Sequence, residues 1–264
     1  MASSVGTAAE NVSLSDGQNT VAEAFSANGA LIRAQPGFVP RAGQTEMALA
    51  VARVVAEGGS LVVEAGTGVG KTFAYLVPAL LSGERVLLST ATKALQDQLF
   101  GRDLPRVLQA LSLPRRTALL KGRSSYLCLH RLALARQLES DDALAEHLGE
   151  IELWAQATQS GDLAELPHLD ERSGIAALVT STRENCLGAG CAHARNCYVY
   201  RARREALGAD VVVVNHHLLF ADLAIKQEGF GEILPGAHAF ILDEAHQVPE
   251  LAGQFFSVSL SARQ

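Results

Sequence analysis

The feature that most constrains this chain is a glycine-rich turn at residues 64–72, which read E-A-G-T-G-V-G-K-T. The apolar run Leu61-Val62-Val63 leads directly into the turn, and the residues after it predict a helix from Lys71 towards Leu81. A strand that turns through glycines into a helix directs successive backbone N–H groups and the positive helix N-terminus at one point. The turn therefore predicts a phosphate-binding loop in an α/β fold.

The turn almost matches the phosphate-loop pattern G-x-x-x-x-G-K-[ST]. Its end fits, but its first position is Ala65 instead of glycine, while Gly66 and Gly68 still allow the backbone to approach phosphate closely. We expect Lys71 to reach the β- and γ-phosphates and the Thr72 hydroxyl to bind Mg²⁺. A strand-to-helix turn that binds nothing is the alternative. The expected nucleotide-binding residues of the loop are Ala65, Gly66, Thr67, Gly68, Val69, Gly70, Lys71 and Thr72.

Three further apolar runs predict strands, at residues 85–90, 210–214 and 239–242. The runs are continuous rather than alternating, which suits strands that are buried on both faces. Because they alternate with helical patterns, they favour a parallel α/β sheet.

The spacing of these runs predicts the domain organisation. Residues 1–20 are rich in Ser, Gly, Asn and Ala and are expected to be flexible, and helices are expected at about 21–33 and 44–56. More than a hundred residues without a strong strand signal separate the second predicted strand from the third. The expected segments are a sheet domain at 21–114 and 206–250, a mainly helical insertion at 115–205, and the start of a further insertion at 251–264.

The charge of the chain is unevenly distributed, although its net value is −6 and its pI is about 5.8. Residues 104–138 hold seven Lys and Arg and no acid, residues 139–171 hold ten acids and no Lys or Arg, and residues 183–204 are basic again. Such blocks indicate either interaction surfaces or solvated helical faces. The chain has no eighteen-residue apolar run and no secretory signal, so we expect a soluble cytoplasmic protein without a membrane partner.

An acidic turn follows the last predicted strand. Asp243 comes directly after Phe240-Ile241-Leu242, where a carboxylate can bind a metal ion, and Glu244 can orient and deprotonate an attacking water. An ordinary helix N-terminus, which also favours acids, is the alternative. Together with the glycine turn, the acidic turn predicts nucleotide hydrolysis, with Lys71, Asp243 and Glu244 as catalytic residues and Thr72 and Asp243 as Mg²⁺ ligands.

All four cysteines lie within one stretch of the chain, at Cys128, Cys186, Cys191 and Cys197. Disulfides are unexpected in a reducing cytosol, so four thiolates predict zinc or a [4Fe–4S] cluster. Zinc sites more often show C-x₂-C pairs than the x₄ and x₅ gaps of this chain. The spacing leaves His130 and His193 open as alternative ligands, and it also leaves open four unrelated buried cysteines.

The motifs resemble a known family. The combination of Asp-Glu-Ala-His at 243–246 with the glycine turn at 64–72 resembles superfamily-two helicases. Lys121-Gly-Arg-Ser-Ser-Tyr-Leu-Cys128 with Cys186-x₄-Cys191-x₅-Cys197 resembles the XPD-type iron–sulfur DNA helicases, in particular the DinG/YoaA branch, from about residue 14 to the end. The resemblance implies a RecA-like P-loop parallel sheet with an inserted, mainly helical domain whose four cysteines bind a [4Fe–4S] cluster. It also implies ATP-dependent 5′→3′ unwinding of DNA in repair or replication.

The same resemblance assigns further residues. Arg41-Ala-Gly-Gln44 resembles the motif whose glutamine reads adenine, because an amide offers both a donor and an acceptor, and His246 belongs to the nucleotide site. Residues 90–98 resemble a DNA-backbone motif with Thr90 and Thr92 as contacts, although Thr92 is equally compatible with a plain helix cap. Lys121 and Arg123 are expected DNA contacts beside the cluster. For Asn215-His216-His217 we expect local capping or DNA contact and no metal site.

The resemblance also implies what the chain lacks. A helicase motor needs a second RecA-like domain, so we expect these 264 residues to be the N-terminal portion of a helicase that acts on single-stranded and forked DNA with ATP, Mg²⁺ and the cluster. Two alternatives stay open: an RNA helicase, and a nucleic-acid-binding or redox-sensing iron–sulfur module with a non-functional motor.

Overall fold

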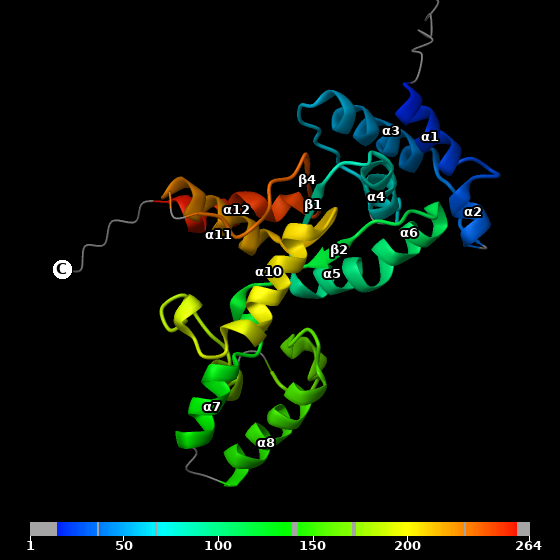
Figure 1. Ribbon diagram of the computed structural model, residues 1–264. Helices are drawn as coiled ribbons and strands as arrows, with labels where there is room; N and C mark the ends of the chain where they lie inside the picture. Colours follow the sequence, from blue (N-terminus) through cyan, green and yellow to red (C-terminus); the bar gives the residue numbers. More distant parts are fainter. Residues whose placement is uncertain are drawn as a thin grey trace, which may run out of the picture. The chain divides into compact units, whose positions relative to one another are not determined.

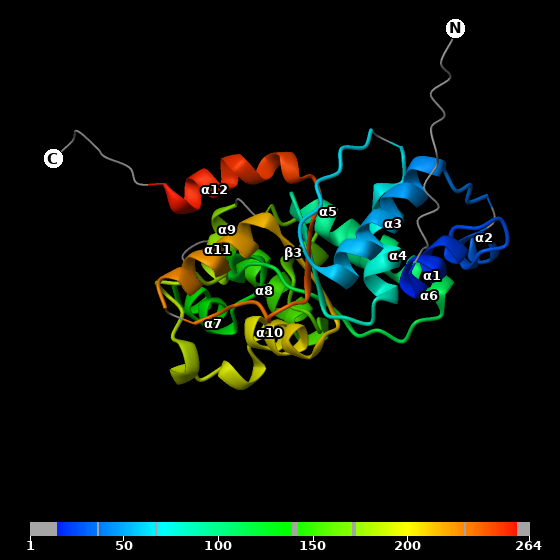
Figure 2. The same cartoon turned by 90° about the horizontal axis from the view of Figure 1, so that it is seen from above.

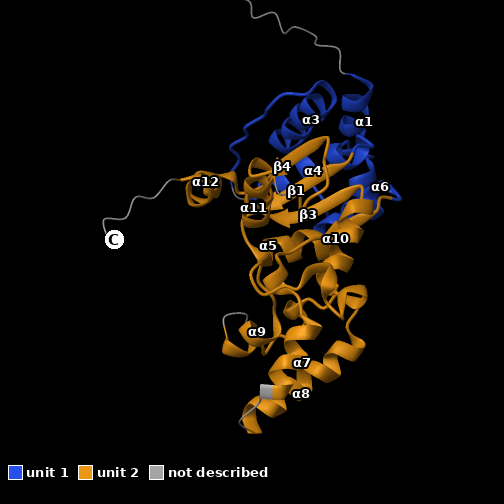
Figure 3. Cartoon of the chain, turned by 60° about the vertical axis from the view of Figure 1, so that its left-hand side comes forward, with its two compact units in different colours: residues 1–84, 103–114 blue, residues 85–102, 115–264 orange. Residues whose placement is uncertain are grey.

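The computed structural model describes residues 15–35, 37–66, 68–138, 142–170, 173–229 and 231–257. By their contacts the residues form two compact units (Figure 3). The first unit combines residues up to 84 with residues 103–114, and the second combines residues 85–102 with residues from 115 onwards.

The described part of the first unit is helical. Leu76 and Leu80 of the central helix α4 are buried, and so are Leu31, Leu104 and Val107 of the neighbouring helices. Helix α4 packs against α1, α3 and α6. The helices of this unit are α1 (Asp16–Ala24), α2 (Ala30–Ala34), α3 (Ala42–Glu57), α4 (Lys71–Leu81) and α6 (Leu104–Leu111).

The beginning of the first unit differs from the expectation of a flexible segment and one long helix. Residues 1–14 lie outside the described residues, but residues 16–20 already belong to α1, whose N-terminus is closed by a capping box between Ser15 and Gln18. The expected helix at 21–33 is two helices separated by a turn. A Cβ at Gly29 in that turn would lie 2.3 Å from the carbonyl oxygen of Ala24, so the break depends on glycine.

The second unit contains a four-stranded sheet in the order β2-β3-β1-β4, in which all three pairings are parallel. The strands are β1 (Val86–Thr90), β2 (Thr117–Leu119), β3 (Val211–Asn215) and β4 (Ala239–Leu242). Every residue of the two central strands β1 and β3 is buried, as their continuous apolar runs predict. The parallel α/β sheet predicted from the sequence is therefore confirmed.

Two strand predictions differ from the structure. Strand β2 is not expected, because three residues at the edge of a sheet give only a weak apolar pattern. Leu61-Val62-Val63 is expected to be a strand but has no strand partner, and the Val62 side chain is 95% exposed. The described part of its unit contains helices and no strand, and an apolar run without a partner for its backbone does not form a ladder.

Helices surround the sheet within the second unit. Both α5 (Lys93–Gln98) and α11 (His216–Gln227) contact the two central strands, and α12 (Val248–Phe256) lies beside α11 (Figure 2). Helix α10 (Tyr198–Gly208) contacts β2 and runs between the sheet and the turns that carry the last three cysteines (Figure 1). The remaining helices of this unit are α7 (Leu129–Leu138), α8 (Asp142–Ala157) and α9 (Gly174–Val179).

One hydrophobic core crosses the boundary expected for the insertion at 115–205. The core joins Leu87 and Val212 of the sheet to Val199 on α10 and to Leu148 and Val179 on α8 and α9. Because these side chains form one continuous cluster, the cysteine-containing segment and the sheet share their packing. No helix of the described residues is both long and apolar enough to cross a membrane.

Leu88 tests the sheet core. This residue lies in β1 between two strands and is 1% exposed, so Leu88→Ala should lower the free energy of unfolding by about 2 to 5 kcal/mol. Leu153→Ala is the matched control, because Leu153 on α8 is 70% exposed and should change stability by less than about 0.5 kcal/mol. Chemical denaturation of both variants measures the difference, and equal losses would contradict the burial assigned to β1.

Candidate functional site

The glycine turn ends in a backbone conformation that requires glycine. Gly68 and Gly70 have φ values of 81° and 88°, in the left-handed region, and α4 begins immediately after Gly70. The buried side chain of Gln44 donates a hydrogen bond from Nε2 to the carbonyl oxygen of Gly70 at 2.9 Å. A Cβ at Gly70 would lie 2.2 Å from that Nε2 atom, so a side chain at this position would displace the Gln44 amide from its hydrogen bond.

The same loop presents groups that suit phosphate. Lys71 and Thr72 form the first turn of α4 and are partly exposed, as are Ala65 and Val69 in the loop. The N–H groups at the start of this eleven-residue helix supply the partial positive charge that an anion needs. Gly66 and Gly68 are exposed, Arg41 lies exposed before α3, and Thr67 lies outside the described residues.

The acidic turn lies at the carboxyl end of the sheet. Asp243 follows β4, and its N–H donates to the carbonyl oxygen of Ser89 on β1 at 2.8 Å. The Asp243 carboxylate in turn accepts the N–H of Glu244 at 3.1 Å. Glu244 has a φ of 55°, which is unusual for a residue with a side chain and costs on the order of 1 to 3 kcal/mol. His246 lies nearby, with its Nδ1 atom 3.4 Å from Oε2 of Glu244.

Sequence reasoning missed the role of one residue at this turn. His216 is fully buried, and its ring spans from Oγ of Ser89, 2.7 Å from Nδ1, to the carbonyl oxygen of Asp243, 2.8 Å from Nε2. A carbonyl oxygen can only accept, so Nε2 carries a hydrogen. Burial lowers the pKa of His216, and in the neutral ring Nδ1 accepts the hydrogen of the Ser89 hydroxyl.

The sequence offered only a weak signal for this contact, because the partners are 127 and 27 residues away from His216. The neighbouring Asn215 does what was expected of it. Its side chain caps α11 by accepting the N–H of Leu218 at 2.8 Å.

The two expected DNA-binding threonines have different surroundings. Thr92 is exposed at the start of α5, where its hydroxyl accepts the N–H of Leu95 at 3.2 Å. Thr90 is 1% exposed, and its hydroxyl donates to the carbonyl oxygen of Thr92 at 3.2 Å. Thr92 is thus accessible at the surface, whereas Thr90 shapes the turn beneath it.

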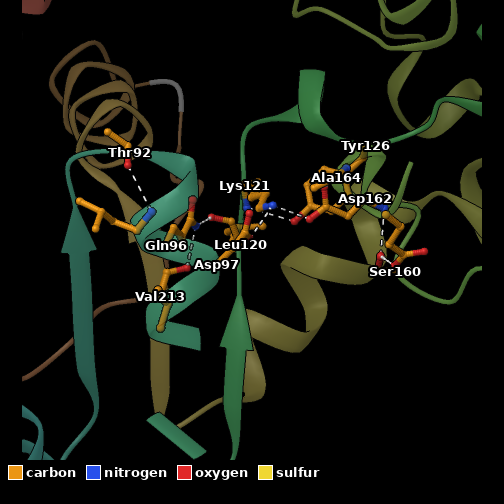
Figure 4. A network of polar contacts seen from close by, with 12 residues as sticks. Thr92, Gln96, Asp97, Leu120, Lys121, Tyr126, Ser160, Asp162, Ala164 and Val213 are labelled. Atoms are coloured by element: carbon orange, nitrogen blue, oxygen red, sulfur yellow. Dashed lines mark hydrogen bonds and ion pairs between the residues drawn. The ribbon is translucent and has the colours of Figure 1, made fainter. Parts of the chain in front are cut away.

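Lys121, a third expected DNA contact, is buried. Its ammonium nitrogen lies 2.7 Å from a carboxylate oxygen of Asp97 on α5 and 2.6 Å from one of Asp162 (Figure 4). The Lys121 side chain is 1% exposed, and its backbone N–H donates to the hydroxyl of Tyr126 at 3.0 Å. Burial by itself lowers the pKa of Lys121, but hydrogen bonds to the two carboxylates outweigh it and raise the pKa above 10.5. Lys121 therefore links α5 to the segment around Asp162 inside the protein.

The four cysteines line one pocket of about 200 Å³. Cys128 precedes α7, Cys197 caps α10, and Cys186 and Cys191 lie in the turns before it. Burial raises the pKa of the Cys128 thiol, the N–H groups of Arg131 and His130 oppose this rise, and the nearby thiols of Cys197 and Cys191 add to it. The structure thus brings all four cysteines together, with His130 but not His193 in the pocket wall.

Four thiols that line one pocket are a donor set of the kind that metal and cluster sites use. Among the described residues, no three His, Cys, Asp or Glu side chains lie close enough to bind one metal ion. A [4Fe–4S] cluster binds each thiolate through a different iron atom, so its ligands surround a larger volume. Arg123, Arg183 and Arg203 also line the pocket, where guanidinium groups can balance the charge of four thiolates.

Comparisons with known proteins point in one direction. Residues 44–132 match the family model described as DEAD/DEAH box helicase. The chain is 50% identical over 251 residues to ATP-dependent DNA helicase YoaA of Haemophilus influenzae, an alignment that covers 94% of this chain and 39% of the relative. It is 50% identical over 243 residues to ATP-dependent DNA helicase YoaA of Escherichia coli, with 91% and 38% covered.

A third relative, ATP-dependent helicase DinG of Mycobacterium tuberculosis, is 42% identical over 248 residues, with 84% of this chain and 36% of the relative covered. The chain therefore spans less than two fifths of the length of these curated relatives.

Lys121→Met tests the buried ion pairs. The substitution keeps most of the side-chain volume but leaves two carboxylates without their cation, so it should destabilise the protein by about 3 kcal/mol. Because the folded-state pKa of Lys121 is raised, this contribution is present at neutral pH and is lost as the pH rises above 10.5. The difference in the free energy of unfolding between variant and wild type, measured by urea denaturation, should therefore be smaller at high pH than at neutral pH.

Arg116→Met is the control for this test. Arg116 also forms an ion pair with an acid, Asp210 at 3.3 Å, but its side chain is 73% exposed, so its loss should cost less than about 1 kcal/mol. Equal effects of the two substitutions would contradict a special role for Lys121.

Proposed function

The chain belongs to the DinG and YoaA family of DEAD/DEAH-box helicases, and from this membership we propose that it couples ATP hydrolysis to movement along single-stranded DNA. The observation that carries the proposal is the acidic turn. A carboxylate pair follows the parallel edge strand β4, and hydrogen bonds to the backbone of Asp243 fix it there, in a chain that also contains the glycine turn. We further propose 5′→3′ unwinding of forked DNA in repair or replication, in the cytoplasm.

Each residue of the proposed nucleotide site has a role. By the family resemblance, Lys71 and the backbone N–H groups of the glycine loop would bind the phosphates, and Thr72 and Asp243 would hold Mg²⁺, which would supply positive charge to the phosphates when bound. Glu244 orients the attacking water and removes its proton. Arg41, Gln44 and His246 complete the site, and Gln44 also fastens the loop through Gly70.

We propose that Cys128, Cys186, Cys191 and Cys197 bind a [4Fe–4S] cluster. The shared pocket and its arginines support this assignment. The cluster, when bound, would link Cys128 to turns more than fifty residues later in the chain and so add order to the proposed insertion at 115–205. The proposed RecA-like motor domain comprises the segments 21–114 and 206–250.

The proposed DNA path uses accessible groups. Thr92 is exposed and Arg123 is partly exposed beside the cysteine pocket, and both offer donors to phosphate oxygens. Lys121, which is buried between two carboxylates, is proposed to support this surface from inside rather than to contact DNA.

Lys71→Ala in the intact natural protein tests the motor. Single-stranded DNA should stimulate ATP hydrolysis by the wild type more than RNA does. The substitution should reduce the stimulated rate by about a hundredfold or more, because it removes a preorganised positive charge at the phosphates. Phosphate release with DNA, with RNA and without nucleic acid measures both effects.

Lys226→Met is the control for Lys71→Ala, because Lys226 lies on the outside of α11 and should keep the wild-type rate. A Lys71→Ala variant with full DNA-stimulated activity, or a wild type that DNA does not stimulate, would overturn the proposed function. Duplexes with single 5′ or 3′ tails test the direction in the same preparation.

Iron analysis tests the cluster. Protein purified without oxygen should be coloured and should contain iron and acid-labile sulfide in equal amounts, and Cys191→Ser should lose both. His193→Ala is the control and should keep its iron, because His193 is not among the residues that line the cysteine pocket. Zinc in place of iron, or iron retained by Cys191→Ser, would contradict the assignment.

A further inference from the structure

We propose that His216 is a positioning residue that links the DNA-contacting turn after β1 to the acidic turn after β4. This inference rests on the proposed function, because it assigns how that function connects DNA contact with hydrolysis. His216 is not among the residues that line the cysteine pocket, and it is not part of the glycine loop.

The place of His216 in the sheet is unusual. It follows the last residue of β3, and β1 lies between β3 and β4. From this position the imidazole reaches Ser89 on β1 and also the residue that follows β4. One buried side chain thus connects the carboxyl ends of three adjacent strands.

The hydrogen bond to Asp243 holds the peptide group on which the acidic turn depends. The carbonyl of the Asp243–Glu244 peptide accepts from His216 Nε2, and the N–H of the same peptide donates to the Asp243 carboxylate. The orientation of this peptide therefore contributes both to the direction of the Asp243 carboxylate and to the backbone conformation of Glu244. Because the left-handed conformation of Glu244 is strained, neighbouring contacts must hold it, and His216 supplies one of them.

The hydrogen bond to Ser89 connects the same ring to the DNA side. Ser89 precedes Thr90, whose buried hydroxyl donates to the carbonyl of Thr92, and Thr92 is the exposed residue that caps α5. A phosphate bound at Thr92 would restrain this turn, and the restraint reaches the Asp243–Glu244 peptide through Ser89 and His216. The path consists of contacts between neighbouring groups, which is the physical requirement for coupling.

Substitutions of His216 in the intact natural protein test the link. His216→Phe keeps a planar ring but removes both polar atoms, so the DNA-stimulated kcat should fall on the order of a hundredfold, as expected for a displaced catalytic group. The KM for ATP should change less than about threefold, because the phosphate loop is unaltered. His216→Gln should recover part of the rate, because its amide N–H can donate to the Asp243 carbonyl.

Ser89→Ala separates the two halves of the link. It keeps the His216–Asp243 hydrogen bond and the backbone bond between Ser89 and Asp243, and it removes only the side-chain bond from Ser89 to His216, so it should reduce the ratio of DNA-stimulated to unstimulated hydrolysis more than the unstimulated rate. Hydrogen–deuterium exchange gives a readout that does not depend on activity. The amides of residues 243–247 should exchange faster in His216→Phe than in the wild type, with or without nucleotide.

His147→Phe is the matched control. His147 is an exposed histidine on α8 whose Nδ1 lies 2.7 Å from the Ala143 carbonyl of its own helix, and this variant should match the wild type in every assay. Should His216→Phe fail to fold, His216→Gln and Ser89→Ala still test the link.

Three results would overturn the inference: unchanged DNA-stimulated kcat in His216→Phe, a Gln variant no better than a folded Phe variant, or an unchanged stimulation ratio in Ser89→Ala. A wild type that DNA does not stimulate would instead remove the proposed function itself, so the two failures are distinguishable.

Discussion

A buried ammonium group between two carboxylates is the interaction on which the second unit depends. Lys121 follows the edge strand β2, and its partners Asp97 and Asp162 belong to α5 and to the segment after α8. Removing a charge from water is costly, so this arrangement is stable only with both acids in place. Because both acids must contact Lys121, the ion pairs hold the sheet, α5 and the segment around Asp162 together. The start of the cysteine segment is held at the same place, because Tyr126 accepts the N–H of Lys121 and lies two residues before Cys128.

The same region shows how the cysteine segment is packed against the sheet. Gln96 on α5 is fully buried and donates from Nε2 to the carbonyls of Leu120 and Val213 at 2.9 and 3.2 Å. These bonds attach α5 to the carbonyl that follows β2 and to a carbonyl in the middle of β3, which also accepts the N–H of Leu120 at 2.9 Å. Together with the shared hydrophobic core, they attach the pocket of four thiols firmly to the sheet.

The two turns proposed to act on the nucleotide both contain a left-handed backbone conformation, but they stabilise it in different ways. Both contain a residue with positive φ, Gly70 in the glycine turn and Glu244 in the acidic turn. Glycine adopts this conformation freely, and at Gly70 the missing Cβ also makes room for Gln44. Glutamate does not, so its turn needs the buried hydrogen bonds of Ser89 and His216 to hold it. The conformation of the acidic turn can therefore change when these hydrogen bonds change, whereas the glycine turn does not need such contacts to keep its conformation.

The sequence by itself determined the features that depend on residue type and local spacing. It predicted three of the four strands, the parallel sheet, the glycine turn, the acidic turn and a common site for the four cysteines. Only the tertiary structure decided which polar side chains are inside. Lys121 and Thr90 are expected DNA contacts, and His216 lies in a motif for which capping or DNA contact is expected, yet all three are buried. Their partners come from elements far along the chain, and burial follows from those long-range contacts rather than from neighbours in sequence.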